Sequence, residues 1–174
     1  MNLPVGVYTR ALDMHRDDRG CFTEIFRAEW PTGAEPLQWN LMSSAAGVLR
    51  GVHVHPKHID YLVLAQGRAS IGLRDLRAGS ATYGLASLLE LSGAQLAALV
   101  IPPGVAHGFL FHEPSLLVYA VDEYWRADDE MGCHWADPEL GIPWPVTSAQ
   151  TSARDTAAQP FRALLVELAG HRSA

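Results

Sequence analysis

The chain has 174 residues with a formal net charge of −6, and 48% of its residues are hydrophobic while 18% are charged. This balance is typical of a globular protein, and the length suits one core, so we expect a single domain over residues 1–174. The sequence contains no run of Lys and Arg that would form the basic stripe required for nucleic-acid binding. Nucleic acid is therefore not an expected partner.

The cysteines and the N-terminal segment bear on the expected location. Cys21 and Cys133 are far apart and lack C-x-x-C spacing, so neither a disulfide framework nor a thiolate zinc site is indicated. The sequence shows no signal-peptide pattern and no apolar stretch of roughly eighteen residues that would suit a membrane span. We expect a soluble cytoplasmic protein with no membrane contact.

Short apolar runs separated by Gly and Pro are typical of a chain with many short strands. In chain order they predict strands over residues 21–26, 37–43, 48–54, 61–65, 69–75, 82–89, 98–101, 107–111 and 116–124. Helical patterns do not alternate with these runs, which favours an all-β sandwich or barrel over a parallel sheet. The apolar positions of residues 161–170 recur at helical spacing and predict a short C-terminal helix on the outside.

The densest group of candidate functional side chains lies in GVLRGVHVHPKHIDYLVLAQG, residues 47–67. His53 and His55 are two residues apart on a predicted strand, so they share a face, which in a barrel can be the interior. Together with Asp60 and His107 they follow the ligand order of metal-binding cupins, and imidazole with carboxylate suits Fe, Mn, Ni or Zn. A metal-dependent cupin enzyme is one open interpretation.

Several longer motifs follow one another between residues 17 and 155. DDRGCFTEIF fits D-x-R-G-x-F-x-E-x-F, and QWNLMSSAAGVLRGVH nearly matches Q-x-N-x-S-x-S-x-x-G-V-L-R-G-L-H. These two motifs are followed, in order, by IPPGVAHGF, VYAVDEYW, Glu130, WADPELGIPWP and SARD. This series resembles the dTDP-4-dehydrorhamnose 3,5-epimerase family of the cupin superfamily.

The resemblance implies a cupin jelly-roll barrel with an epimerase-like core over about residues 17–155 and a C-terminal extension over residues 156–174. It also implies a homodimer whose subunits bind a dTDP-type nucleotide-diphosphate sugar without a metal or other cofactor. The implied reaction inverts carbons next to the 4-keto group of a 4-keto-6-deoxy sugar.

The catalytic roles are also carried over from the family. A C–H beside a ketone is a weak acid, and its removal needs a base with a pKa near the working pH, which histidine has. By resemblance, His53 is this base, and Asp155 orients the imidazole and stabilises its cationic form. Inversion further requires an acid on the opposite face of the sugar, and Tyr119 matches that residue.

The family also suggests substrate-binding positions, and arginine suits diphosphate oxygens because of its fork geometry. The matching residues are Arg19, Glu24, Gln38, Asn40, Arg50, Tyr61, His107 and Tyr124.

The match has gaps. The family has a lysine in a Q-x-K-L-V segment that steadies the enolate oxygen, and HIDYLV is predicted to place Tyr61 there. Ala120 and Trp125 also depart from the family, which often has Lys and Tyr at these positions. His55 and His58 could donate to an enolate or bind a metal. Inversion of a single carbon, or a non-catalytic nucleotide-sugar-binding homologue, therefore remains open.

Overall fold

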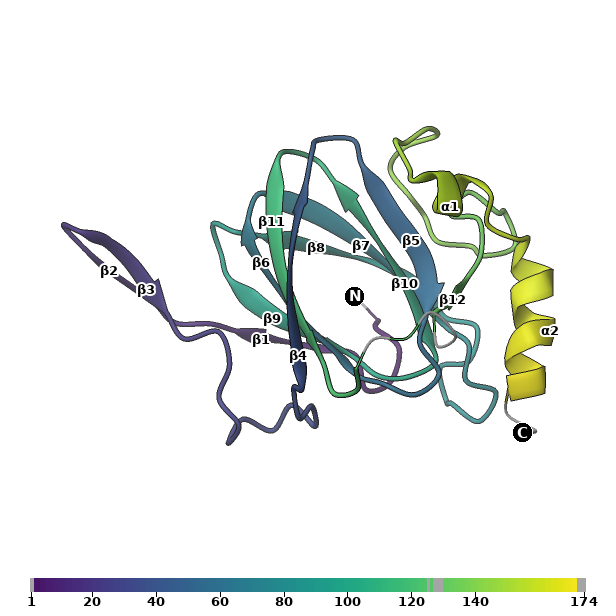
Figure 1. The fold of residues 1–174 in the computed structure, drawn as a ribbon, viewed down its shortest axis with the longest axis horizontal. Coiled ribbons are helices and arrows are strands. Elements are labelled where there is room, and N and C mark those ends of the chain that lie inside the picture. Colours follow the sequence, from purple (N-terminus) through teal and green to yellow (C-terminus); the bar gives the residue numbers. More distant parts are fainter. Residues whose placement is uncertain (1, 125, 127–129, 172–174) are drawn as a thin grey trace.

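The computed structural model describes residues 2–124, 126 and 130–171, which form a barrel of two facing antiparallel sheets (Figure 1). One sheet has the strand order β1 (Tyr8–Ala11), β9 (Ala97–Ile101), β6 (Asp60–Gln66), β11 (Ser115–Val121) and β4 (Gln38–Ser44). The other has the order β12 (Met131–Gly132), β5 (Leu49–Val54), β10 (Val105–Phe111), β7 (Arg68–Asp75) and β8 (Ala86–Ser92). The predicted all-β, cupin-type jelly roll is confirmed.

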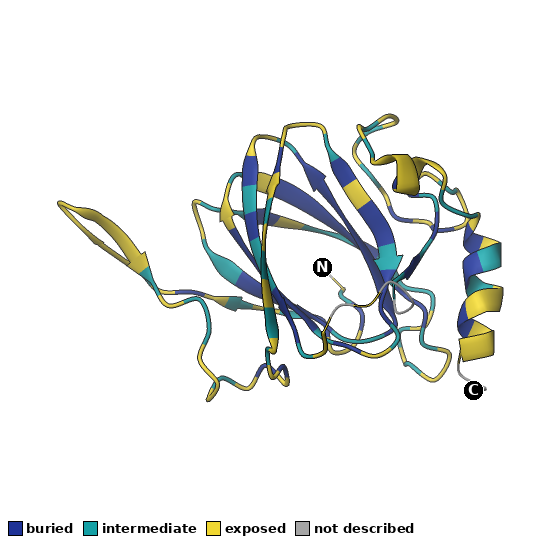
Figure 2. Ribbon diagram, in the orientation of Figure 1, coloured by how far each residue is buried: buried dark blue, intermediate teal, exposed yellow. Residues whose placement is uncertain are grey.

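A separate hairpin of β2 (Met14–Asp17) and β3 (Gly20–Thr23) projects away from the barrel (Figure 1). Most of its residues are exposed (Figure 2), and the Phe22 side chain is 66% exposed.

The inner faces of the two sheets supply the apolar core between them. Leu62 and Leu64 of β6 meet Ile71 and Leu73 of β7 in one buried cluster that also contains Phe111. Burying a side chain of this size contributes about 1.5–3 kcal/mol. The core thereby fixes the distance between the two walls that surround the cavity.

Two helices follow the strands: α1 (Ala153–Thr156) and α2 (Phe161–His171). Phe161, Leu164 and Leu168 form the buried stripe of α2 and pack in the same cluster as Leu49 and Val52 of β5. Figure 2 shows this buried face turned toward the barrel. The predicted C-terminal helix is confirmed. No helix among the described residues is long and apolar enough to cross a bilayer.

The predicted strands are confirmed, with differences at some ends. β3 ends at Thr23 and β11 ends at Val121, both three residues before the predicted ends. β8 starts at Ala86 because the preceding residues form a turn in which Leu85 N donates to Thr82 O at 2.9 Å. β1, β2, β12 and α1 were not predicted. Each has at most four residues, too few to show a period of hydrophobicity.

Candidate active site

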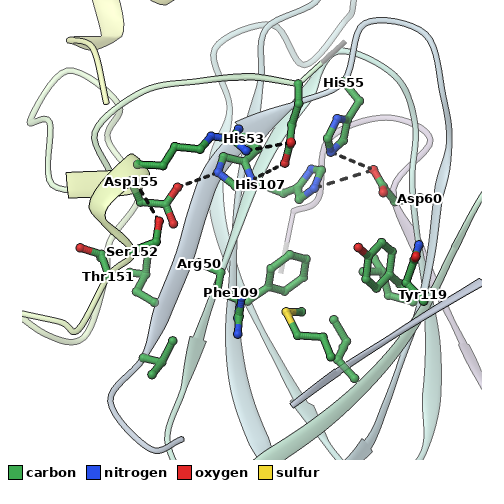
Figure 3. A pocket seen from close by; sticks show the side chains of 18 of the residues that line it. Arg50, His53, His55, Asp60, His107, Phe109, Tyr119, Thr151, Ser152 and Asp155 are labelled. Carbon is green, nitrogen blue, oxygen red and sulfur yellow. Dashed lines mark hydrogen bonds and ion pairs between the residues drawn. The ribbon is translucent and has the colours of Figure 1, made fainter. Parts of the chain in front are cut away.

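A cavity of about 460 Å³ opens between the two sheets (Figure 3). β5 and β10 form one wall, β4, β6 and β11 form the other, and α1 lies at its edge. The apolar part of the lining includes Met42, Leu62, Phe109 and Leu117. An apolar cavity with a few convergent polar groups is typical of a small-molecule site.

His53 and Asp155 form a hydrogen-bonded pair in this cavity. The Nε2 atom of His53, on β5, lies 2.8 Å from Oδ1 of Asp155, on α1 (Figure 3). Burial alone would raise the pKa of Asp155, but hydrogen bonds from His53, Ser152 and Gly51 together with the His53 charge hold that pKa below its ordinary value. Asp155 is therefore an anion that accepts the Nε2 proton, and in the neutral ring Nδ1 carries the lone pair.

A second carboxylate faces the other ring nitrogen. Glu130 Oε1 lies 3.4 Å from His53 Nδ1, and Glu130 Oε2 accepts a hydrogen bond from Arg154 Nη1 at 2.8 Å. The imidazole thus lies between two carboxylates. The sequence interpretation included Glu130 in the motif series but gave it no role, so this contact was missed.

Tyr119, on β11, lies on the opposite wall from His53 (Figure 3). Burial raises the pKa of its phenol above the ordinary value of 10.0. The Asp60 and Glu130 carboxylates add to this rise, and the Arg50 charge opposes it. The hydroxyl is therefore a proton donor at neutral pH.

Three predicted substrate-binding residues line the cavity: Asn40, Arg50 and His107. The Arg50 Nε atom donates to Ser44 Oγ at 2.9 Å, which fixes the guanidinium at the cavity wall. Asn40 accepts a hydrogen bond from Gln38 at 2.9 Å, so Gln38, which is not among the lining residues, contacts one that is.

His107 is buried, and burial lowers the pKa of its ring to about 4. Its Nδ1–H donates to the Val105 carbonyl at 3.1 Å, so in the neutral ring the lone pair is on Nε2. This atom faces Asp60, with 3.7 Å between Nε2 and Oδ2.

His55 and His58 also surround Asp60, and all three line the cavity. The structure thus brings together three of the four metal ligands expected from the sequence, while His53 is bound to Asp155.

The expectation that Tyr61 lies in the cavity is wrong. Its hydroxyl donates to the Ile25 carbonyl at 2.5 Å, and its ring packs edge-on against Phe26. Because successive strand residues point to opposite faces, its neighbours Asp60 and Leu62 line the cavity instead. At this point of the wall, the cavity therefore has a carboxylate in place of a phenol.

The structure does not bring Arg19, Glu24 or Tyr124 to the cavity within this chain. Arg19 lies in the turn of the projecting hairpin and pairs with Asp17 at 2.5 Å, and Glu24 lies 3.5 Å from Arg27. Tyr124 is 70% exposed. Their substrate-binding roles stay predictions. Trp125 lies outside the described residues.

Together, the jelly-roll barrel and its apolar cavity with convergent polar groups define a cupin-type enzyme. The family model for dTDP-4-dehydrorhamnose 3,5-epimerase matches residues 4–163, and the chain belongs to this family. It is 36% identical over 147 residues to the dTDP-4-dehydrorhamnose 3,5-epimerase of Pseudomonas aeruginosa, which covers 76% of this chain and 78% of that protein.

The chain is also similar to two further epimerases. The chain is 32% identical over 159 residues to a dTDP-4-dehydrorhamnose 3-epimerase of Streptomyces niveus, covering 86% of this chain and 77% of that protein. It also superimposes, with a TM-score of 0.85 and 30% identity, on the Legionella pneumophila dTDP-6-deoxy-D-glucose-3,5-epimerase, solved in complex with dTDP-4-keto-L-rhamnose. That match covers 94% of this chain and 92% of the other.

Proposed function

We propose that this enzyme epimerises a dTDP-linked 4-keto-6-deoxy sugar by removing and returning protons next to the ketone. The observation that carries the proposal is the 2.8 Å contact between His53 and Asp155 inside the cavity, opposite Tyr119. Membership of the epimerase family and the ligand in the Legionella pneumophila complex support the substrate class.

In the proposed reaction, the basic nitrogen of His53 takes the proton from the carbon beside the ketone. The C–H electron pair moves to the carbonyl oxygen and forms an enolate, while Asp155 stabilises the imidazolium. The enolate then collapses and takes a proton from the Tyr119 hydroxyl on the other face, which inverts the carbon. Solvent returns a proton to Tyr119 and accepts one from His53.

Arg50 and Asn40 are proposed to bind the nucleotide part. Arg50 brings a guanidinium to the cavity wall, and such a group binds diphosphate oxygens through paired hydrogen bonds. Asn40 offers an amide whose orientation is held by Gln38. These two residues lie on strands β4 and β5, which belong to the two sheets on either side of the same cavity.

The reaction is tested by incubating the pure protein with dTDP-4-keto-6-deoxyglucose in deuterated water and locating the label by NMR. We expect deuterium at C3 and C5, because both carbons adjoin the ketone and one base can serve both. Label at C3 alone would indicate a single-carbon epimerase, the activity named for the Streptomyces niveus relative. Absence of label at either carbon would refute epimerisation of this substrate.

A homodimer is proposed for the assembly. β4 lies at the end of its sheet's strand order and exposes Trp39 and Leu41, the latter to 68%. Pairing with a second copy would cover this strand and these side chains. It would also offer the projecting hairpin, with Arg19 at its turn, a neighbouring molecule to contact.

The dimer is tested by light scattering after size exclusion. We expect about twice the chain mass of 19.0 kDa for the wild type, and dissociation for Leu41→Glu, which places a charge on the exposed edge strand. Val166→Glu, at a 74% exposed position of α2, is the control. A wild-type protein that elutes at the mass of one chain would contradict the dimer.

That residues 1–174 form one domain, and that the protein works in the cytoplasm, also stay predictions. The packing of α2 into the same cluster as β5 favours the first. The second is favoured by the free thiols of Cys21 and Cys133.

A further inference from the structure

A second group of side chains, separate from the His53–Asp155 pair, lines the same cavity. His55, His58 and Asp60 are 8%, 4% and 4% exposed. One potential ligand atom from each of them lies within 4.8 Å of the others. The proton-transfer steps proposed above use none of the three, so their convergence calls for another explanation.

Two separations within this group are slightly longer than those between ligand atoms around one small cation. Asp60 Oδ2 lies 3.9 Å from His55 Nε2, and Asp60 Oδ1 lies 3.8 Å from His58 Nε2. Both separations exceed the usual N–H···O limit of about 3.2 Å. Ligand atoms bonded at about 2.0–2.1 Å to a tetrahedral zinc ion lie about 3.4 Å apart. Around such an ion, these two separations would each shorten by about half an ångström, and the group as a whole, whose ligand atoms lie within 4.8 Å of one another, would contract.

The orientation of His107 adds a fourth donor. Since its Nδ1–H donates to the Val105 carbonyl, Nε2 carries the lone pair and points at Asp60 Oδ2 from 3.7 Å. Two electron-pair donors that face each other repel, and a cation between them would remove that repulsion. A backbone carbonyl that fixes the tautomer is also the usual support of a metal-binding imidazole.

The geometry points to a divalent transition-metal site in which His55, His58 and Asp60 bind the ion and His107 completes a four-coordinate set. Three imidazoles and one carboxylate suit Zn²⁺. This set differs from the one expected from the sequence, because His58 takes the place of His53. The site rests on the positions of these side chains, and its test does not depend on the proposed sugar chemistry.

The test uses the full chain purified without a histidine tag, stripped with a chelator and then dialysed against Zn²⁺ without sugar. We expect about one zinc per chain by elemental analysis, and a higher thermal unfolding temperature, because an ion that binds the folded state stabilises it. Replacement by Co²⁺ should give the visible absorption of a four-coordinate site. Less than about a tenth of an equivalent of zinc would overturn the proposal.

Variants separate this site from adventitious binding. Asp60→Asn and His58→Gln should each weaken zinc binding by about 100-fold or more, whereas the exposed His171→Gln serves as a matched control and should bind like the wild type. Circular dichroism establishes that each variant is folded, and His58→Gln carries the test if Asp60→Asn does not fold. Wild-type affinity in a folded His58→Gln or Asp60→Asn variant would overturn the site.

Discussion

Replacing His53 by glutamine is expected to lower the rate of solvent exchange at C3 and C5 of the sugar by about 10³-fold, within the 10²–10⁴ range of general base catalysis. Glutamine keeps a hydrogen-bonding group near Asp155 Oδ1 but has no basic nitrogen at neutral pH. The loss should therefore fall on proton removal, the step on which both inversions depend. Proton NMR in deuterated water measures it directly.

Two controls make this result specific. His134→Gln changes a histidine that does not line the cavity and should exchange like the wild type. Binding of dTDP to His53→Gln, measured by calorimetry, should be little changed if the cavity is intact. Exchange at the wild-type rate in His53→Gln would remove His53 as the base and with it the proposed role of Asp155.

The sequence predicted the main strands because many of them are bounded by Gly, Pro or other turn-forming residues and hold apolar runs, as in β7 and β10. It did not predict β12, whose two residues are a strand only because Met131 and Gly132 pair with β5. Pairing between distant segments leaves no local pattern in so short a segment. The same applies to α1, a helix of four residues whose first turn is capped by Ser152.

The sequence predicted some residues of the candidate site correctly and missed or misplaced others. His53 and Asp155 are 102 positions apart in the sequence, and only the family resemblance predicted that they form a pair. The error at Tyr61 has a physical cause: the first five residues of β6 are buried on both faces, so the strand lacks the alternation that shows which residues face the cavity. Glu130 was missed because a single carboxylate in a loop has no pattern that indicates its partner.

The Tyr119→Phe variant should separate proton exchange from inversion. It removes one hydroxyl and keeps the ring, which lies half-buried among the apolar side chains of the core, so the fold should be unaffected. His53 remains able to remove the proton, and deuterium should still enter the sugar. Inversion should fall by about 10²-fold or more, because the acid on the other face is lost.

The products show which step has failed. In the wild type, label and inverted configuration should appear together, whereas in Tyr119→Phe most labelled sugar should keep its original configuration. Since burial and the nearby carboxylates raise the pKa of Tyr119, the wild-type acid stays protonated at neutral pH, and loss of this proton should lower inversion only at a more alkaline pH than for an ordinary tyrosine. An equal loss of exchange and inversion in Tyr119→Phe would instead mean that the hydroxyl acts before the enolate forms, as a group that positions the ketone.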